Sequence, residues 1–247
     1  EYEVAFNVIR DGDDVNDFLN LRGNSQLRVE LYQQLVENLP HRQDWRYGAC
    51  LTSLGNAYHS LGRYPEAIAF YEQSLNIARD IGDKRGEANS LIGLGNAYYS
   101  LGRYQEAIAF HEQSLDIQRD IGDKRGEATS LNNLGNVYYS LGRYEEAIAF
   151  HEESLDIQRD IGNRQGEANS LIGLGNAYYS LGRYEEAIAF QKQSLEIQRK
   201  IGDRGGEAAS LCNLGNAYNS LKRYQEAIAV LEQSLDIARD IGNRQDE

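Results

Sequence analysis

The strongest constraint on this chain is an internal repeat of 40 residues. The tripeptide Leu-Gly-Asn begins at residues 54, 94, 134, 174 and 214. Arg-Tyr begins at 63, 103, 143, 183 and 223, and Glu-Ala-Ile-Ala at 66, 106, 146, 186 and 226, in the same register. Regular self-similarity at a period of roughly 20 to 50 residues predicts a stack of identical supersecondary units, each covering the apolar face of its neighbour.

Each unit reads as two helices, shown here for the second unit. Apolar residues at intervals of three and four predict one helix over about 86–101 and another over about 104–121. Gly102 and Gly122 stand where helices end in a left-handed residue, and Asp123 stands where a helix begins. Lys222 replaces this glycine in the last unit, which predicts a weaker helix end there. The predicted apolar stripes are Leu91, Leu94, Gly95, Tyr98, Leu101; Ala107, Ile108, His111, Leu115; and Phe110, Ser114, Ile117, Ile121.

The pattern Leu91, Leu94-Gly95, Tyr98, Ala107 resembles the tetratricopeptide repeat (TPR), whose usual period is about 34 residues. The longer form, with Leu-Gly-Asn-Ala-Tyr and Gly-Asp-x-x-Gly-Glu-Ala, is similar to the repeats of Pins/LGN-type adaptors and to the repeat arms of bacterial STAND-type signalling proteins. This resemblance implies an all-α fold, a right-handed superhelical solenoid of antiparallel helix pairs. It also implies a protein-binding role, with the first helix of each pair on the concave side.

Five tandem units are predicted over residues 45–247, at 45–83, 84–123, 124–163, 164–203 and 204–243. Residues 1–44 match the pattern only in part, and we interpret them as a degenerate repeat or cap whose first helix covers about 3–10 and 15–21. The alternative is the end of a different upstream domain. Because the chain starts without methionine and stops where a next unit would begin, we expect it to be part of a longer protein.

One position of the predicted concave face is asparagine in all five units. Mid-helix asparagine is unfavourable for the helix and calls for a reason. A carboxamide offers two donors and an acceptor, which suits pairing with the backbone of an extended peptide. The alternative is that the asparagine bonds a neighbouring repeat and was copied with it. The predicted peptide-binding residues are Asn56, Asn96, Asn136, Asn176, Asn216, Asn89, Asn132, Asn169, Tyr99, Tyr139 and Tyr179.

Charge bears on the class of partner. The net charge of −13 disfavours nucleic acid and anionic membrane surfaces, and favours neutral or basic protein segments. A glutamate in the first turn of four of the five concave helices is explained by the helix dipole. The alternative is an acidic rim for a basic ligand, formed by Glu87, Glu127, Glu167 and Glu207.

The sequence favours no enzyme. It lacks a phosphate-binding loop, and we predict no catalytic, cofactor or metal site. His111 and His151 occupy a position that is Tyr, Gln or Leu in other units, which indicates packing rather than metal ligation. Cys50 and Cys212 lie four units apart, so we expect no disulfide between them and a cytoplasmic location.

The sequence therefore predicts a protein-interaction scaffold that binds an extended segment in its concave groove, within a larger signalling protein. One alternative is an intramolecular sensor arm that holds a STAND-type ATPase inactive. The other is a structural solenoid that self-associates end to end through its exposed repeat faces.

Overall fold

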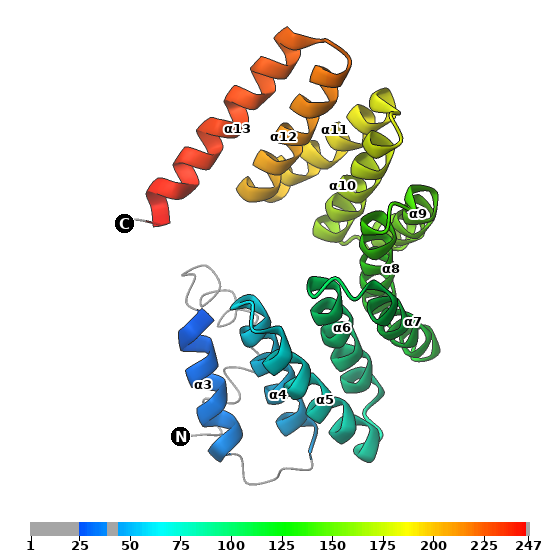
Figure 1. Cartoon of the computed structure of the whole chain (residues 1–247), viewed down its shortest axis with the longest axis vertical. Coiled ribbons are helices and arrows are strands. Elements are labelled where there is room, and N and C mark those ends of the chain that lie inside the picture. Colours follow the sequence, from blue (N-terminus) through cyan, green and yellow to red (C-terminus); the bar gives the residue numbers. More distant parts are fainter. Residues whose placement is uncertain (1–24, 39–43, 246–247) are drawn as a thin grey trace. The chain divides into compact units, whose positions relative to one another are not determined.

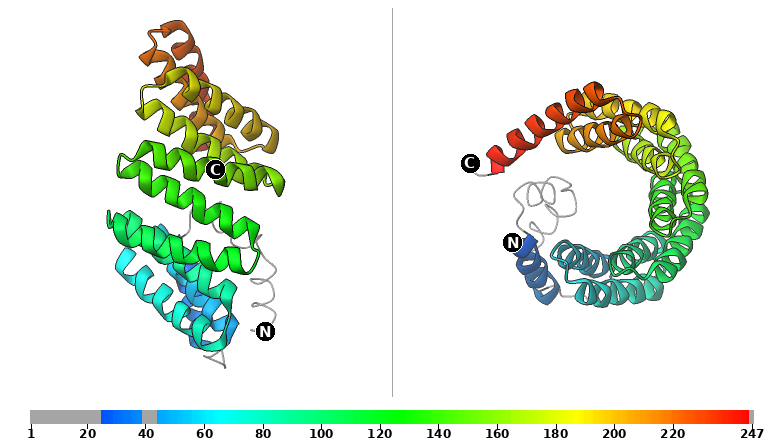
Figure 2. Two further views of the ribbon diagram at one scale, coloured as in Figure 1. Left: turned by 90° about the vertical axis from the view of Figure 1, so that its right-hand side faces the viewer. Right: turned by 45° about the horizontal axis from the view of Figure 1, so that its top comes forward.

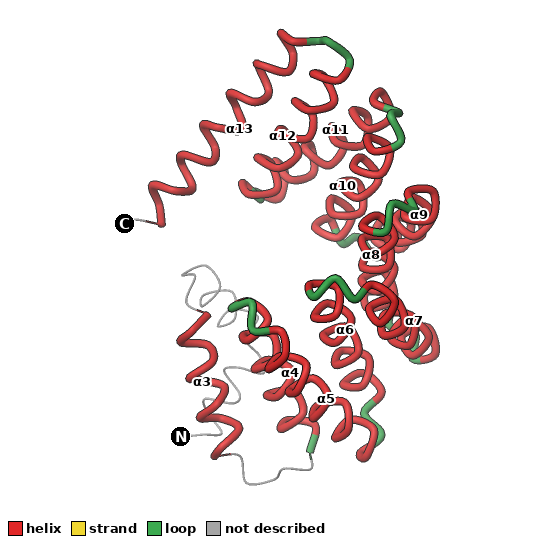
Figure 3. The backbone as a smooth tube through the Cα atoms, viewed as in Figure 1, coloured by secondary structure: helices red, strands yellow, loops and turns green. Residues whose placement is uncertain are grey.

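A computed structural model of the chain describes residues 25–38 and 44–245. Those residues form eleven α-helices, without a strand among them, and short turns join the helices from α4 onward (Figures 1 and 3). The helices form two compact units, Glu1–Gly122 and Asp123–Glu247. The described helices of the first unit are α3 (Ser25–Asn38), α4 (Trp45–Ser60), α5 (Tyr64–Ile81), α6 (Lys84–Ser100) and α7 (Tyr104–Asp120). Those of the second are α8 (Lys124–Ser140), α9 (Tyr144–Asp160), α10 (Arg164–Ser180), α11 (Tyr184–Ile201), α12 (Arg204–Ser220) and α13 (Tyr224–Gln245).

Within each unit, every helix packs on the next one along the chain, and the two helices of a repeat are antiparallel (Figure 2). This is the predicted all-α solenoid of helix pairs. Its right-handed superhelix stays a prediction.

The first helix of the second repeat starts slightly earlier than predicted, because an acidic side chain caps it. The α6 helix begins at Lys84 rather than Gly86, since the Asp83 carboxylate accepts a hydrogen bond from the Gly86 backbone N–H at 2.9 Å. Asp123, which was predicted to open a helix, caps α8 in the same way at 3.0 Å. Such a cap satisfies a backbone donor that has no partner inside the helix.

The turn inside each repeat uses a left-handed residue, as predicted. Gly102 has φ +72°, a conformation that costs glycine little. Lys222 adopts φ +61° at the equivalent turn, where a side chain makes the left-handed conformation strained.

The recurring Arg-Tyr motif closes the same turn. The Arg103 guanidinium lies 4.5 Å from the centre of the Tyr98 ring, which stacks on Phe110 with ring centres 5.2 Å apart. Glu106 accepts a hydrogen bond from Arg103 Nε at 2.9 Å. The motif thus joins the two helices of one repeat by a cation–π contact and an aromatic stack.

The core of each repeat is built on the leucines of the first helix. Leu91 and Leu94 are fully buried, as predicted. The prediction was wrong for Leu101 and Ile121, which are 41% and 40% exposed. Both follow the last residue of a helix and lie in the turn, where the helical spacing no longer directs a side chain inward.

In the first unit, α3 packs on α4. Val29, Tyr32 and Leu35 of α3 are buried there, and Gln33 Nε2 donates to Tyr58 Oη at 2.7 Å. The first helix predicted for the degenerate repeat, over about 3–21, lies outside the described residues.

Candidate functional site

The five repeated asparagines lie on the accessible side of α4, α6, α8, α10 and α12. We call them the asparagine column: Asn56, Asn96, Asn136, Asn176 and Asn216. Each is half-buried or exposed in the structure, although its neighbours in the Leu-Gly-Asn motif are buried. The other predicted binding residues, Asn89, Asn132, Asn169, Tyr99, Tyr139 and Tyr179, are also half-buried or exposed. All of them are therefore available for contact.

Beneath the column, one residue of each second helix packs against the glycine of the Leu-Gly-Asn motif in the first helix of the same repeat. We call these the wedge residues: Tyr71, His111, His151, Gln191 and Leu231. His151 lies so close to α8 and α10 that a Cβ on Gly135 or Gly173 would come within 2.7 and 2.4 Å of its ring. The recurring Leu-Gly pair thus has a packing reason, because the glycine leaves room for the wedge residue.

The wedge residue decides which hydrogen bonds the column makes. Tyr71 Oη donates to Asn56 Oδ1 at 2.7 Å, and Gln191 Nε2 donates to Asn176 Oδ1 at 3.1 Å. Leu231 offers Asn216 no such bond. Among the described residues, the carboxamides of Asn96, Asn136 and Asn216 have no hydrogen-bond partner. Part of the column is therefore held internally and part is open.

One contact matches the alternative that the asparagines bond a neighbouring repeat. Asn213 Nδ2 of α12 donates to Asn176 Oδ1 of α10 at 3.1 Å. Asn176 therefore accepts from two side chains, one in its own repeat and one in the next.

The tyrosines beside the column are fixed in place. Tyr139 Oη lies 3.1 Å from Ser180 Oγ, and Tyr179 Oη lies 3.2 Å from Ser220 Oγ, so each ring reaches the next repeat. The Tyr179 ring also packs against Tyr184, with centres 5.4 Å apart. Sequence reasoning did not find these serines, although serine recurs at the end of every first helix.

Pockets that include predicted binding residues occur in both units. In the first unit, a pocket of about 680 Å³ lies between α4, α5 and α6 and includes Trp45, Thr52 and Asn89. In the second unit, a pocket of about 290 Å³ includes Asn132 and Asn169. Another of about 230 Å³ is lined by Tyr139, Gly175, Asn176, Tyr179, Ala187, Gln191, Asn213 and Asn216. The last pocket brings together four of the predicted binding residues.

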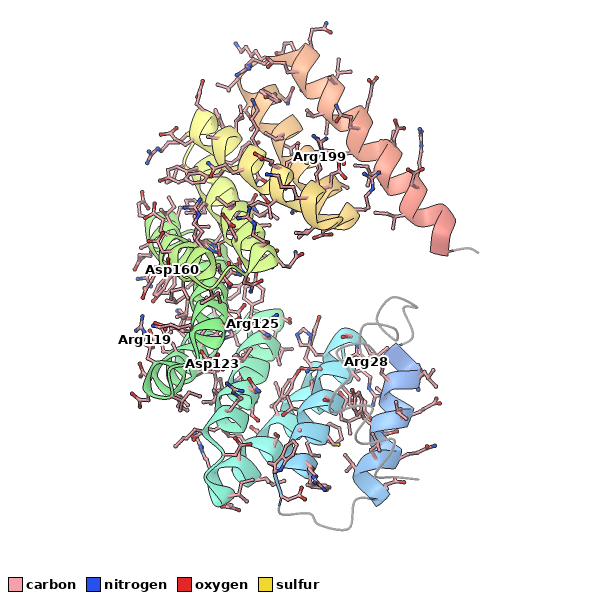
Figure 4. The ribbon with its side chains drawn as sticks, turned by 180° about the vertical axis from the view of Figure 1, so that it is seen from behind. Arg28, Arg119, Asp123, Arg125, Asp160 and Arg199 are labelled. Carbon is pink, nitrogen blue, oxygen red and sulfur yellow. The ribbon has the colours of Figure 1, made fainter. Side chains whose placement is uncertain are left out.

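The alternative explanation for the first-turn glutamates, an acidic rim for a basic ligand, does not fit their burial. The four glutamates Glu87, Glu127, Glu167 and Glu207 are only 5–6% exposed, and each forms an ion pair with a lysine or arginine whose side chain is 48–61% exposed. Glu207 pairs with Arg204 at 2.6 Å and with Arg199 of α11 at 2.8 Å. Figure 4 labels Arg199 on α11. A buried carboxylate requires such partners, and two cations leave it no charge to offer a ligand.

The pKa of Glu87 reflects both its burial and its ion pairs. Burial would raise this pKa, but hydrogen bonds from Lys84 and Arg79 outweigh it, so that the pKa lies below its ordinary value. The glutamate stays ionised and links α5 to the start of α6.

The two histidines are buried wedge residues. Burial lowers the pKa of both His111 and His151 to about 4, so both are neutral at pH 7. His151 Nδ1 lies 3.0 Å from Asn132 Oδ1. Among the described residues, no group of three or more His, Cys, Asp or Glu side chains could hold a metal ion. Within the same ranges, no helix has the length and apolar character needed to cross a membrane.

These features define a helical-repeat protein with an accessible polar face. The model of the tetratricopeptide repeat family matches residues 48–120, 88–160, 126–200 and 166–240, and the chain belongs to this family. The family consists in general of protein-binding scaffolds rather than enzymes.

Three solved structures share the fold. BtubC (BKLC) from P. vanneervenii has 22% identity and a TM-score of 0.73, over 90% of this chain and 91% of that one. A STAND protein with a tetratricopeptide repeat sensor from Pyrococcus horikoshii has 19% identity and a TM-score of 0.72, and the match covers 97% of this chain and 41% of that one. The Rap conjugation gene regulator of plasmid pLS20, in complex with the Phr* peptide, has 16% identity and a TM-score of 0.70, and the match covers 92% of this chain and 72% of that one. No curated protein matches the chain.

Proposed function

We propose that this chain is a protein-interaction scaffold that binds an extended peptide segment along the asparagine column. The observation that carries the proposal is the pocket of about 230 Å³ in the second unit, where column asparagines and fixed tyrosines line one accessible hollow. Tyrosine provides a large contact area at a small cost in conformational entropy, and carboxamides pair with peptide groups of any sequence. The Rap regulator that shares this fold is in complex with a peptide, which supports the same use here.

The proposed ligand is neutral to basic. The scaffold's preference for such a ligand follows from its net charge of −13. The glutamates of the first helices do not contribute, because they are paired with arginine or lysine of this chain. The wedge residues and Tyr–Ser hydrogen bonds hold the face in one arrangement, so binding orders few side chains of the scaffold.

Self-association is the second candidate, and α13 favours it. Ile228 and Leu235 are 52% and 50% exposed, whereas the equivalent Ile188 and Leu195 of α11 are 6% and 8% exposed beneath α12. An apolar face of this kind associates with a matching helix. Sedimentation velocity over a range of concentrations tests this: a mass that stays monomeric removes the candidate.

The peptide proposal is tested with a bead-displayed library of random nine-residue peptides. The chain selects peptides, and fluorescence anisotropy then gives their affinities for the triple variant Asn136→Ala/Asn176→Ala/Asn216→Ala. Asn76→Ala, an exposed asparagine of α5 away from the column, is the control. We expect the triple variant to lose on the order of tenfold or more in affinity, since several hydrogen bonds are removed together, while the control binds normally.

Far-ultraviolet circular dichroism checks that the triple variant keeps its helices. If the selected peptides bind the folded triple variant as well as the unchanged chain, the asparagine column is not the binding surface and the proposal is wrong. The intramolecular sensor role predicted from the resemblance to STAND-type proteins would instead appear as altered activity of a longer protein on column substitution, without any added partner.

A further inference from the structure

A buried amide of the second unit lacks a partner for its oxygen. Gln191, the wedge residue of α11, is 1% exposed, and its Oε1 has no hydrogen-bond partner. Buried acceptors in folded proteins are nearly always satisfied, by protein, water or ligand. Gln191 also lines the pocket of about 230 Å³ between α10, α11 and α12. An unsatisfied acceptor next to a pocket indicates that a donor belongs there.

The hydrogen bonds of the Gln191 amide nitrogen set the orientation of this side-chain amide. Gln191 Nε2 donates to Asn176 Oδ1 at 3.1 Å and to the Ile172 carbonyl at 3.4 Å, both on α10. The reversed amide would place Oε1 against two acceptors. The oxygen therefore lies on the side of the amide away from these α10 acceptors.

Hydrogen bonds connect the carboxamides of Gln191, Asn176 and Asn213 beside this pocket. Asn176 Oδ1 accepts from Gln191 Nε2 and also from Asn213 Nδ2. The groups left for a ligand are the Gln191 oxygen, the Asn213 oxygen, the N–H groups of Asn176 and the carboxamide of Asn216. These offer both hydrogen-bond acceptors and donors in the same pocket.

A primary carboxamide presents the complementary set, with two N–H donors and one oxygen acceptor. A carboxylate has acceptors alone, and a guanidinium or ammonium has donors alone. None of the residues lining the pocket is charged, so a buried ionic group would find no counter-charge there. The pocket therefore fits a neutral amide better than any ionised side chain.

This arrangement is specific to the junction between the last two repeats, where α11 packs on α12. At the preceding step within the second unit, the wedge residue is His151 and the residue matching Asn213 is Gly173, which packs directly on the His151 ring. Repeats that are otherwise nearly identical thus differ at the two positions that build the amide cluster.

We propose that this pocket is a subsite for a primary carboxamide, the side chain of an asparagine or glutamine in a bound peptide. Tyr139 and Tyr179 flank the subsite, and the exposed carboxamide of Asn216 lies at the same pocket. The inference rests on the proposed peptide-binding function, to which it adds a side-chain preference at one place on the face.

The test uses the full chain and arrays of nine-residue peptides, randomised except at one fixed position. That position is Gln, Asn, Glu, Lys, Leu or glutamine methylated on its side-chain nitrogen. Two variants take residues already used by other repeats: Gln191→Leu, as at Leu231, and Asn213→Gly, as at Gly173. Each new residue already occupies the equivalent position of another repeat.

We expect the unchanged chain to prefer Gln or Asn on the order of tenfold over Glu, Leu and the methylated amide, since two or three hydrogen bonds distinguish them. Both variants should lose this preference and keep their binding to the rest of the peptide. If the unchanged chain binds peptides without preferring Gln or Asn, or if the preference survives Gln191→Leu, the subsite is wrong and the pocket holds water only. If no peptide binds at all, the proposed function itself has failed.

Discussion

Replacing Gly93 by alanine tests how tightly the wedge residues are packed. An added Cβ at Gly93 of α6 would lie 2.4 Å from Cε1 of Tyr71, and a Cβ at Gly55 of α4 would lie 2.6 Å from the same atom. The ring is confined from both helices and is further held by its 2.7 Å hydrogen bond to Asn56. It cannot move aside without breaking contacts on the far side.

Two opposing effects set the magnitude. Alanine is favoured over glycine in a helix interior by about 1 kcal/mol. Overpacking a core typically costs about 1–3 kcal/mol, and here the clash is with a ring confined on both sides. We therefore expect Gly93→Ala to lower the free energy of unfolding by about 1–2 kcal/mol. Gly205→Ala is the matched control, because its nearest atom, Asp203 Oδ1, lies at 3.6 Å and leaves room for the methyl group.

The assay is urea unfolding followed by far-ultraviolet circular dichroism, with midpoint and slope compared, since repeat arrays can depart from two-state behaviour. Gly205→Ala should be unchanged or more stable. In a Tyr71→Ala background, Gly93→Ala should no longer destabilise the protein, because the clashing ring is gone. Equal or greater stability of Gly93→Ala in the otherwise unchanged chain would refute the reasoning.

Three further predictions concern stability. Lys222→Gly should raise the free energy of unfolding by about 1 kcal/mol in urea, since it relieves the left-handed strain at φ +61°. For His111 and His151, the folded pKa of about 4 lies below the ordinary value of 6.5, so the unfolded chain binds protons first as pH falls. Stability that is full above pH 6.5 should decline down to about pH 4, by up to roughly 3 kcal/mol per histidine. Substituting both by glutamine should flatten this decline relative to the unchanged chain in pH-dependent unfolding, and an identical profile would show that they are not buried. Glu207→Gln should cost about 1–2 kcal/mol, because it weakens two charge-assisted hydrogen bonds to a buried carboxylate, whereas Glu66→Gln, in an exposed pair, should leave the urea midpoint unchanged.

The repeat by itself determined the class of fold. A period of 40 residues, leucines at helical spacing and glycines or Asp at the helix boundaries sufficed to predict antiparallel helix pairs, because these are local signals of helix and turn. The sequence also placed the asparagine column on an accessible face, since residues three and four apart share one side of a helix.

Only the tertiary structure shows which contacts the recurring residues of the repeat make. Periodicity places Glu207 in a first turn, but only packing shows that Arg199 and Arg204 bury and neutralise it. Likewise, the chain alone does not reveal that Gln191 and Asn213, 22 positions apart in sequence, meet at Asn176. Local sequence fixes which way a side chain leaves its helix, whereas its hydrogen-bond partners depend on which helix lies opposite, and that is set by the stacking of one repeat on the next.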